Sequence, residues 1–579
     1  MTAALKGAPK APATLGSLLP KRRRRLLLGI LMLTVAAFLV AASGQFRSID
    51  DENLYYTAHS LTSGIPNVDI CPGTNQAADF LYTRGPHGCE DSAQEQLENS
   101  YQKGAGGKLV SKYGIGEPLA AAPFFGAGRI VAGILSDASV GGCTGPTSTT
   151  CCKTLVTNSE SFRANCQGDT RDMIVQTSTL FTNSFLTAIT LVLVMIVSLQ
   201  LGATMRGAAL IGFAFGFGSY AFAYAKTMNA EPGTAMCLIA AVMFAIEAAR
   251  TGRTRALVLC GVAAGAALLF RSTAAIFLPV LGVWFLVLGW RHANTKRAFR
   301  WGALFSMGAI ASLVVLMLLN SWRYGDPFSL GYGQTGSHIH GIRARGNILT
   351  GFWGLWLSPG KSLFLYAPFV LLAVAGIVIS VRKFAAEMSL LIALVAVNTF
   401  FFARVRFWSG DWAWGPRYMI IVLPCLAVMC APLVNMVRWR RALTALAGVG
   451  FLFPGTLGVI VNFNTYYLRA NRQLGTDFRD RVYHDWAWNP IWKHLGILGN
   501  EWGNFGKPFG LLYLTGQPRF DLWWLDDRWW LSQHSGRLAA AILMLSGIAA
   551  LAGGGLFIIQ RARRTANTPA GTRPRLLPK

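Results

Sequence analysis

Three consecutive carboxylates, Asp50, Asp51 and Glu52, follow the first long apolar stretch of the chain by only a few residues, and Tyr55 comes shortly after them. A carboxylate that lipid and aromatic rings shield from water accepts a proton more readily than a solvated one. The alternative interpretation is a solvated loop start. We favour a general base that deprotonates a hydroxyl group, and the pattern does not separate the three residues.

Four cations stand beside apolar stretches, where they suit the binding of a phosphate group. Lys112 lies in a turn with two nearby glycines, and the alternative is a lysine that snorkels to anchor the following helix. Arg271 lies in a tight hairpin, where a lipid head group or a neighbouring carboxylate is the alternative partner. A nucleotide-binding loop is excluded at Lys361, because Leu355 occupies the position of the required first glycine. The phosphate-binding candidates are Lys112, Arg271, Arg417 and Lys361.

Further polar and aromatic residues are expected to line a substrate cavity with these groups. Glu231 stands at the start of an apolar stretch, where stabilisation by the helix dipole is the alternative. Asp411 and Trp412 belong to a tryptophan-rich stretch, which an aromatic belt at the membrane interface explains only in part. The cavity candidates are Tyr55, Tyr113, Glu231, Asp411 and Trp412.

The elements that must position these residues are membrane-spanning helices. Of the 579 residues, 53% are hydrophobic and only 14% are charged, and the mean hydropathy is +0.40. A soluble protein carries roughly 25% charged residues. Apolar runs long enough to cross a bilayer recur, and they are continuous rather than alternating. We predict an all-α polytopic membrane protein with about 12 transmembrane helices, near 26–44, 178–200, 207–225, 233–249, 256–270, 273–290, 301–320, 361–381, 388–403, 417–435, 443–461 and 537–559.

The net charge of +27 indicates cytoplasmic loops rich in lysine and arginine, or a basic surface for anionic lipids. Nucleic-acid binding is not indicated, since no motif for it is present. If the N-terminus lies inside, every connection that falls on the inner side is basic. The prediction is a protein of the plasma (bacterial inner) membrane, with both termini in the cytoplasm and the active site on the periplasmic or extracellular side.

This topology divides the chain into two basic cytoplasmic tails, a transmembrane catalytic module with two outer loops, an outer-face loop domain and a last span. The ranges are 1–25, 26–461 with outer loops 45–177 and 321–360, 462–536, 537–559 and 560–579. Within the first loop, residues 118–135 are apolar but contain Pro123, Gly126 and Gly128. We interpret that segment as an interfacial or re-entrant helix rather than a span.

Six cysteines fall in the first outer loop, and an even set in an exported loop indicates disulfides. Their pairing stays open, because six cysteines allow fifteen connectivities. Metal binding is the weaker alternative, since the adjacent Cys151 and Cys152 have no matching CxxC partner and no histidine nearby. No metal site is predicted. The disulfide candidates are Cys71, Cys89, Cys143, Cys151, Cys152 and Cys166.

In their order and common sidedness, these motifs resemble the GT-C superfamily of integral-membrane glycosyltransferases. More narrowly, the chain is similar to bacterial relatives of the dolichyl-phosphate-mannose protein mannosyltransferases, over about residues 20–560. The motifs that carry the resemblance are Asp51-Glu52, Lys112-Tyr113-Gly114, Glu231-Pro232, Arg271, Ser358-Pro359-Gly360-Lys361 with Tyr366-Ala367-Pro368, and Gly415-Pro416-Arg417-Tyr418.

The resemblance implies a polyprenyl-phosphate-linked sugar donor and an acidic residue of the first outer loop as base, which by position is Asp51. The expected reaction moves a hexose or pentose to an acceptor hydroxyl on a lipid, glycan or protein by a single inverting displacement. Membrane lipids are the other expected partners, and the superfamily leaves a divalent cation open as a cofactor. The long six-cysteine loop departs from the family pattern, so acceptor recognition stays open.

Two other functions remain as alternatives. A lipid-linked sugar transporter or flippase carries charges within its spans, and Glu247 is the clearest acidic residue in a span here. A surface polysaccharide polymerase or ligase relies on arginine and histidine in a late outer loop, where Arg469, Arg472 and His484 stand. The near absence of charge within the spans disfavours the transporter, and the carboxylates after the first span disfavour the polymerase.

Overall fold

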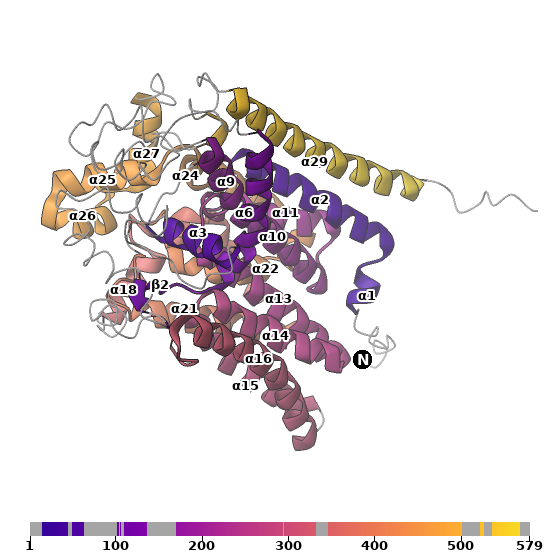
Figure 1. Cartoon of the computed structure of the whole chain (residues 1–579). Coiled ribbons are helices and arrows are strands. Elements are labelled where there is room, and N and C mark those ends of the chain that lie inside the picture. The colour runs from indigo at the N-terminus through magenta and orange to yellow at the C-terminus, as the bar shows by residue number, and fades with distance from the viewer. Residues whose placement is uncertain are drawn as a thin grey trace, which may run out of the picture.

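The computed structural model of this chain describes residues 14–44, 49–62, 101–103, 105, 109–135, 170–292, 294–329, 331, 346–410, 412–500, 522–525 and 535–567. Within these ranges the regular structure is helical, apart from an antiparallel pair formed by β1 (Tyr101–Lys103) and β2 (Leu109–Ser111) (Figure 1). Eight of the described helices are long and apolar enough to cross a membrane. The predicted class, an all-α polytopic membrane protein, is confirmed.

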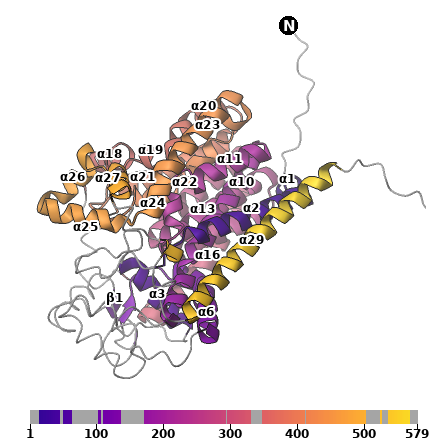
Figure 2. The ribbon, with the colours of Figure 1, turned by 90° about the horizontal axis from the view of Figure 1, so that it is seen from above.

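The first part of the chain forms helices that pack around the predicted base. The helix α3 packs against α6, and α9 is followed almost directly by α10, so that Met173–Gln200 makes one long apolar stretch. The helix α2 runs beside the last helix, as two views at right angles show (Figures 1 and 2). The bounds are α1 (Leu15–Leu18), α2 (Lys21–Val40), α3 (Ile49–Thr62), α6 (Gly116–Leu135), α9 (Thr170–Leu180), α10 (Thr182–Gln200) and, last, α29 (Ser535–Asn567).

The middle of the chain forms the most deeply buried part of the bundle. The helix α13 is buried along most of its length, and α14 packs between it and α16. The bounds are α11 (Met205–Gly216), α12 (Ala221–Tyr224), α13 (Ala230–Thr251), α14 (Thr254–Phe270), η2 (Ser272–Ile276), α15 (Phe277–His292) and α16 (Thr295–Tyr324).

The later spans are broken into shorter pieces. Pro416, Pro424 and Pro432 divide the span predicted near 417–435, because proline lacks a backbone donor and clashes with the preceding helical turn. The bounds are α18 (Ile348–Trp356), α19 (Leu363–Tyr366), η3 (Pro368–Val370), α20 (Leu371–Ser380), α21 (Ala385–Ala403), η4 (Arg417–Ile421), α22 (Leu423–Met429), η5 (Leu433–Asn435), α23 (Val437–Gly450), the π-helical η6 (Phe451–Gly455) and α24 (Thr456–Ile460).

The segment predicted as a late outer loop is helical in its described part. Its helices form a layer that projects from the bundle on the side away from the C-terminal end of α29 (Figure 2). The bounds are α25 (Phe463–Leu474), η7 (Gly475–Asp477), α26 (Phe478–His484), η8 (Trp486–Trp488), α27 (Pro490–Asn500) and η10 (Trp523–Leu525).

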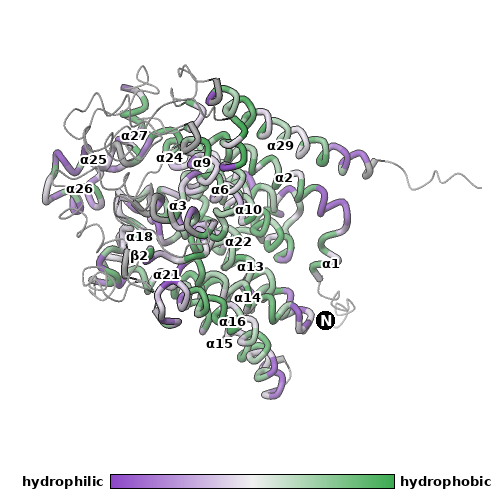
Figure 3. The backbone as a smooth tube through the Cα atoms, in the orientation of Figure 1, coloured by the Kyte–Doolittle hydropathy of each residue, from purple (hydrophilic) through white to green (hydrophobic). Residues whose placement is uncertain are grey.

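The basic helix ends lie along one edge of the molecule. Figure 3 shows the hydrophilic start of α2, the end of α29, and the α13–α14 and α15–α16 turns along its right-hand and lower edge. The hydrophilic helices α25 and α26 lie at the opposite edge. This arrangement agrees with the alternation of basic connections in the sequence. Which edge faces the cytoplasm stays a prediction from the positive charge.

The helix predicted at residues 118–135 is present, and its placement at the membrane interface rather than across the membrane stays a prediction. The helix α6 is continuous through Pro123, Gly126 and Gly128, and it is among the helices long and apolar enough to cross a membrane. Gly128 serves packing, because a Cβ atom there would lie 2.9 Å from the Val175 Cα and 3.0 Å from the Ser178 Cβ of α9. A small residue lets two helix backbones approach closely.

We predict that Gly128→Leu lowers the thermal unfolding temperature of the purified protein, because overpacking a tight helix contact costs about 1–3 kcal/mol. Gly126→Leu is the matched control on the same helix, since no atom lies within 4 Å of a Cβ built there. Equal unfolding temperatures for the two variants would show that the α6–α9 contact is not close.

Candidate functional site

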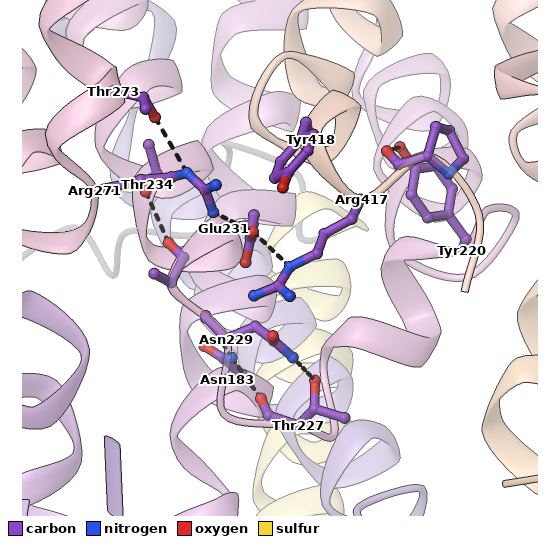
Figure 4. Close-up of polar contacts among 12 residues, drawn as sticks. Asn183, Tyr220, Thr227, Asn229, Glu231, Thr234, Arg271, Thr273, Arg417 and Tyr418 are labelled. Carbon is purple, nitrogen blue, oxygen red and sulfur yellow. Dashed lines mark hydrogen bonds and ion pairs between the residues drawn. The ribbon is translucent and has the colours of Figure 1, made fainter. Parts of the chain in front are cut away.

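Two arginines converge on one buried carboxylate at the centre of the structure. Arg271 Nη1 and Arg417 Nε both donate to Oε1 of Glu231, the latter over 2.7 Å (Figure 4). Glu231 is fully buried, and the two guanidinium groups approach it from opposite sides. The sequence had assigned Glu231 to a cavity and both arginines to a phosphate. The structure brings all three together, and it confirms the alternative partner considered for Arg271, a neighbouring carboxylate.

The position of Glu231 follows from the polar turn that precedes α13. The Asn183 side chain of α10 donates to the backbone carbonyls of Thr227 and Asn229, the second over 2.9 Å. The Asn229 side chain donates to the Thr227 hydroxyl over 2.6 Å (Figure 4). Glu231 then falls in the first turn of α13, where backbone N–H groups lack helical partners and favour a carboxylate.

Aromatic rings and a hydroxyl hold the Arg271 side chain in place. Its Nε donates to the Thr273 hydroxyl over 3.1 Å, and its guanidinium carbon lies 4.9 Å from the centre of the Tyr418 ring. Tyr418 in turn stacks on Phe402 with ring centres 4.3 Å apart. A cation over an aromatic face is stabilised by the ring quadrupole, so these rings fix where the positive charge sits.

Two glycines in the left-handed region direct the loop that carries Arg417. Gly410 has a φ of +70° and Gly415 a φ of +71°, conformations that other residues rarely adopt. A Cβ atom on Gly410 would lie 2.9 Å from the Arg417 Cβ. The Tyr220 hydroxyl donates to the Pro416 carbonyl over 3.1 Å. The glycines and the proline of this stretch therefore set the path of the backbone so that the Arg417 side chain reaches Glu231.

Two more buried carboxylates share this region. Asp51 of α3 and Glu117 of α6 have relative exposures of 1% and 0%. Both Asp51 and Glu231 act electrostatically on Glu117, so the three carboxylates lie within range of one another. The helix α3 brings Asp51 here by packing Leu54 and Ala58, which share its face, against Ala121 of α6.

Close backbone contacts around Phe270 bring these elements together. A Cβ atom on Gly114 would lie 2.3 Å from the Phe270 carbonyl oxygen, and one on Gly116 would lie 2.7 Å from the Phe270 nitrogen. A Cβ atom on Gly233 would lie 2.1 Å from the Phe270 ring. The start of α6 and the start of α13 therefore both touch the residue before Arg271, and Glu117 follows Gly116 directly in the chain.

Lys112 is buried in the turn that leads to Glu117. Its ammonium group lies 5.2 Å from the centre of the Tyr113 ring. Arg323 donates to the carbonyls of Ser111 and Tyr113, and the Tyr324 hydroxyl donates to the Ser111 carbonyl over 2.9 Å. The end of α16 thus holds this turn against the bundle.

Lys361 belongs to a second group of residues, beside the late helices. Its ammonium group donates to the Ala413 carbonyl and lies 5.3 Å from the ring centres of both Tyr467 and Tyr483. Trp412 stacks on Tyr467 with ring centres 6.4 Å apart. These contacts connect Lys361 to α25 and α26.

Of the other predicted site residues, some lie within the described part of the structure and some lie outside it. Tyr55 packs on Phe125 of α6 with ring centres 5.4 Å apart. The side chains of Asp50 and Glu52, and all of Asp411, lie outside the described residues. The six disulfide candidates, Cys71, Cys89, Cys143, Cys151, Cys152 and Cys166, also lie outside them. Among the residues that the structure describes, no group of three or more histidine, cysteine, aspartate or glutamate side chains is arranged to hold a metal ion.

His59 adds no positive charge to this region at neutral pH. It lies in the last turn of α3, with its ring 5.3 Å from that of Phe125. Burial, and then the charge of Arg129, lower the pKa of its imidazole below the usual range. The cations near Asp51 are therefore lysine and arginine.

Sequence reasoning missed Glu117 and Tyr418 as site residues, although Tyr418 stands in the Gly415–Tyr418 motif and Glu117 follows the Lys112–Gly114 motif by three residues. The signal for Glu117 was an acidic residue at the first turn of an otherwise apolar helix, directly after Gly116. The signal for Tyr418 was its position next to Arg417.

Among solved structures, the chain is similar to ArnT from Cupriavidus metallidurans, crystallised with undecaprenyl phosphate bound. The sequence identity is 12% and the TM-score is 0.42, over 93% of this chain and 76% of that one. No protein-family model matches the chain, and no curated protein sequence matches it. A TM-score below 0.5 does not define a common fold, so the chemistry rests on the chain's own residues.

We predict that Glu231→Ala lowers the thermal unfolding temperature, because removing one partner of a buried ion pair costs about 3–5 kcal/mol. Asp485→Asn is the control, because it removes an exposed ion pair to Arg481 (3.0 Å) and leaves the unfolding temperature unchanged. An unfolding temperature of Glu231→Ala equal to that of the wild type would contradict the buried pair.

Proposed function

We propose that this protein is a glycosyltransferase that moves a sugar from a polyprenyl-phosphate-linked donor to an acceptor hydroxyl. The observation that carries the proposal is the convergence of Asp51, Glu117, Glu231, Arg271 and Arg417 from five separate segments of the chain. Phosphate binding and proton removal need opposite charges close together. This region holds three buried carboxylates and two arginine side chains that are only 21% and 19% exposed.

The donor phosphate binds at Arg271 and Arg417, with Lys112 contributing from the turn before α6. Guanidinium groups match the geometry of phosphate oxygens and remain charged when buried. Glu231 holds the two arginines in place before the donor arrives, so little side-chain entropy is lost on binding. The lipid tail of the donor then extends between the helices into the membrane.

The reaction is a single displacement at the anomeric carbon. Asp51 takes the proton of the acceptor hydroxyl while the acceptor oxygen forms a bond to that carbon. The bond between the carbon and the phosphate oxygen breaks, and polyprenyl phosphate leaves with the electron pair. Attack from the side opposite the leaving group inverts the configuration. The arginines stabilise the charge that develops on the phosphate.

The basic edge of the molecule supports a site on the exported face. The lysine-rich and arginine-rich helix ends lie along one edge in Figure 3, and the hydrophilic helices α25 and α26 lie at the other. By the positive-inside rule, we infer that α25, α26 and the phosphate site lie outside the cytoplasm. The donor is either a hexosyl or a pentosyl lipid, and both fit this chemistry.

The contacts of Glu247 weaken the transporter alternative. Its carboxylate accepts from the Leu15 backbone nitrogen over 2.8 Å and lies 3.6 Å from Arg253. Both partners belong to the basic edge of the molecule. The clearest acidic residue within a span is thus explained by local pairing, rather than by an ion pathway in the middle of the bilayer.

We predict that Asp51→Asn lowers the rate of sugar transfer by roughly 10²–10⁴-fold, because an amide cannot take the proton. The measurement is transfer of radiolabelled sugar, or slow hydrolysis of the donor, by purified protein in lipid. Asp480→Asn, an exposed change on α26, is the control and keeps full activity. A fully active Asp51→Asn protein would rule out this base.

We predict that Arg271→Met and Arg417→Met each lower the affinity for polyprenyl phosphate by roughly tenfold or more, the value of a hydrogen bond to a charged group. Binding of the radiolabelled lipid to protein in nanodiscs measures this. Arg481→Met, which changes an exposed arginine of α26, leaves the affinity unchanged. Wild-type affinity in both site variants would place the phosphate elsewhere.

A further inference from the structure

Glu117 is a fully buried carboxylate whose two oxygens have no hydrogen-bond partner among the residues that the structure describes. Two other buried glutamates are paired: Glu231 with two arginines, and Glu247 with Leu15 and Arg253. A buried polar group without a partner costs free energy, so an exception of this kind calls for an explanation.

The fold directs this side chain toward the site. Gly116 is pressed against Phe270, and Phe270 precedes Arg271, which pairs with Glu231. The backbone next to Glu117 is therefore held against the residue that precedes Arg271. The electrostatic effects of Glu231 and Asp51 on Glu117 show independently that it faces the same region.

The charges of this region favour a neutral ligand at Glu117. Among the described residues, no group of three or more histidine, cysteine, aspartate or glutamate side chains here is arranged to hold a metal ion. A phosphate is repelled by a carboxylate. Hydroxyl groups are the ligands that suit Glu117 best, because each carboxylate oxygen accepts hydrogen bonds. A buried acceptor is stabilised most when a donor pairs with it.

We propose that Glu117 binds hydroxyl groups of the donor sugar and so determines which sugar is accepted. This inference rests on the proposed glycosyltransferase function. In it, Arg271 and Arg417 bind the phosphate, Asp51 removes the acceptor proton, and Glu117 binds the sugar between them. A site built around a hydrogen bond to a hydroxyl rejects an analogue without that hydroxyl, because its own polar group is then left unpaired.

The test measures binding to protein in nanodiscs, with two sets of radiolabelled probes. One is polyprenyl phosphate without sugar, and the other is its mannosyl, glucosyl, galactosyl and arabinosyl esters. The wild type is expected to bind at least one ester more tightly than the bare lipid phosphate. Glu117→Leu lowers the affinity for that ester by roughly tenfold or more and changes that for the bare phosphate by less than about twofold.

A conservative variant and a matched control are measured beside Glu117→Leu. Glu117→Gln keeps the size of the side chain and one acceptor oxygen, so its loss of affinity for the ester is smaller than that of Glu117→Leu. Glu247→Gln also removes the charge of a buried glutamate, at the basic edge, and leaves the affinities for both probes unchanged. The unfolding temperature of each variant confirms that it is folded.

The two proposals fail in different ways. If the wild type binds neither the bare lipid phosphate nor any ester, the glycosyltransferase function is wrong and this inference falls with it. If the wild type binds polyprenyl phosphate, the function stands, and three results overturn the role of Glu117 alone. These are no preference for any ester, an unchanged affinity of Glu117→Leu for the preferred ester, and an equal loss for the ester and the bare phosphate.

Discussion

The ion pairs of Glu231 with Arg271 and Arg417 are the interaction on which the rest of the site depends. Two guanidinium groups in a buried place repel each other unless a carboxylate lies between them. Glu231 supplies that carboxylate from the first turn of α13, and the aromatic rings beside Arg271 limit where its charge can move. A pair of cations suited to phosphate is thereby held in place by the protein itself.

Phe270 makes that interaction part of the fold rather than a contact on its surface. Its backbone touches Gly114 and Gly116, and its ring touches Gly233. Any larger residue at these glycines would push α6 or α13 away from Arg271. The segment 111–117 is also held by Arg323 and Tyr324 at the end of α16. Helices from distant parts of the sequence therefore fix the carboxylates and the arginines in one arrangement.

The sequence predicted the helical class and the positions of many helices, but it did not predict the contacts between the candidate site residues. Hydropathy and charge alternation act locally along the chain, so they indicated the spans near 233–249 and 256–270 well. Glu231 is 40 residues from Arg271 and 186 from Arg417, and no local pattern links them. The packing role of Gly128 could not be predicted from the sequence, because it depends on the contact with α9. Glu117 was missed for the same reason: its significance lies in what surrounds it in space.

The proposed donor, a sugar phosphate, carries its negative charge at one end and neutral hydroxyls at the other, so a carboxylate of the site meets different groups depending on the end that it faces. A carboxylate beside the phosphate would weaken binding unless it were already paired, and Glu231 is paired. A carboxylate beside the sugar can accept hydrogen bonds from the sugar hydroxyls only if no protein group already occupies it. Glu117 meets this condition among the described residues. The pairing of each carboxylate thus corresponds to the part of the donor that it would face.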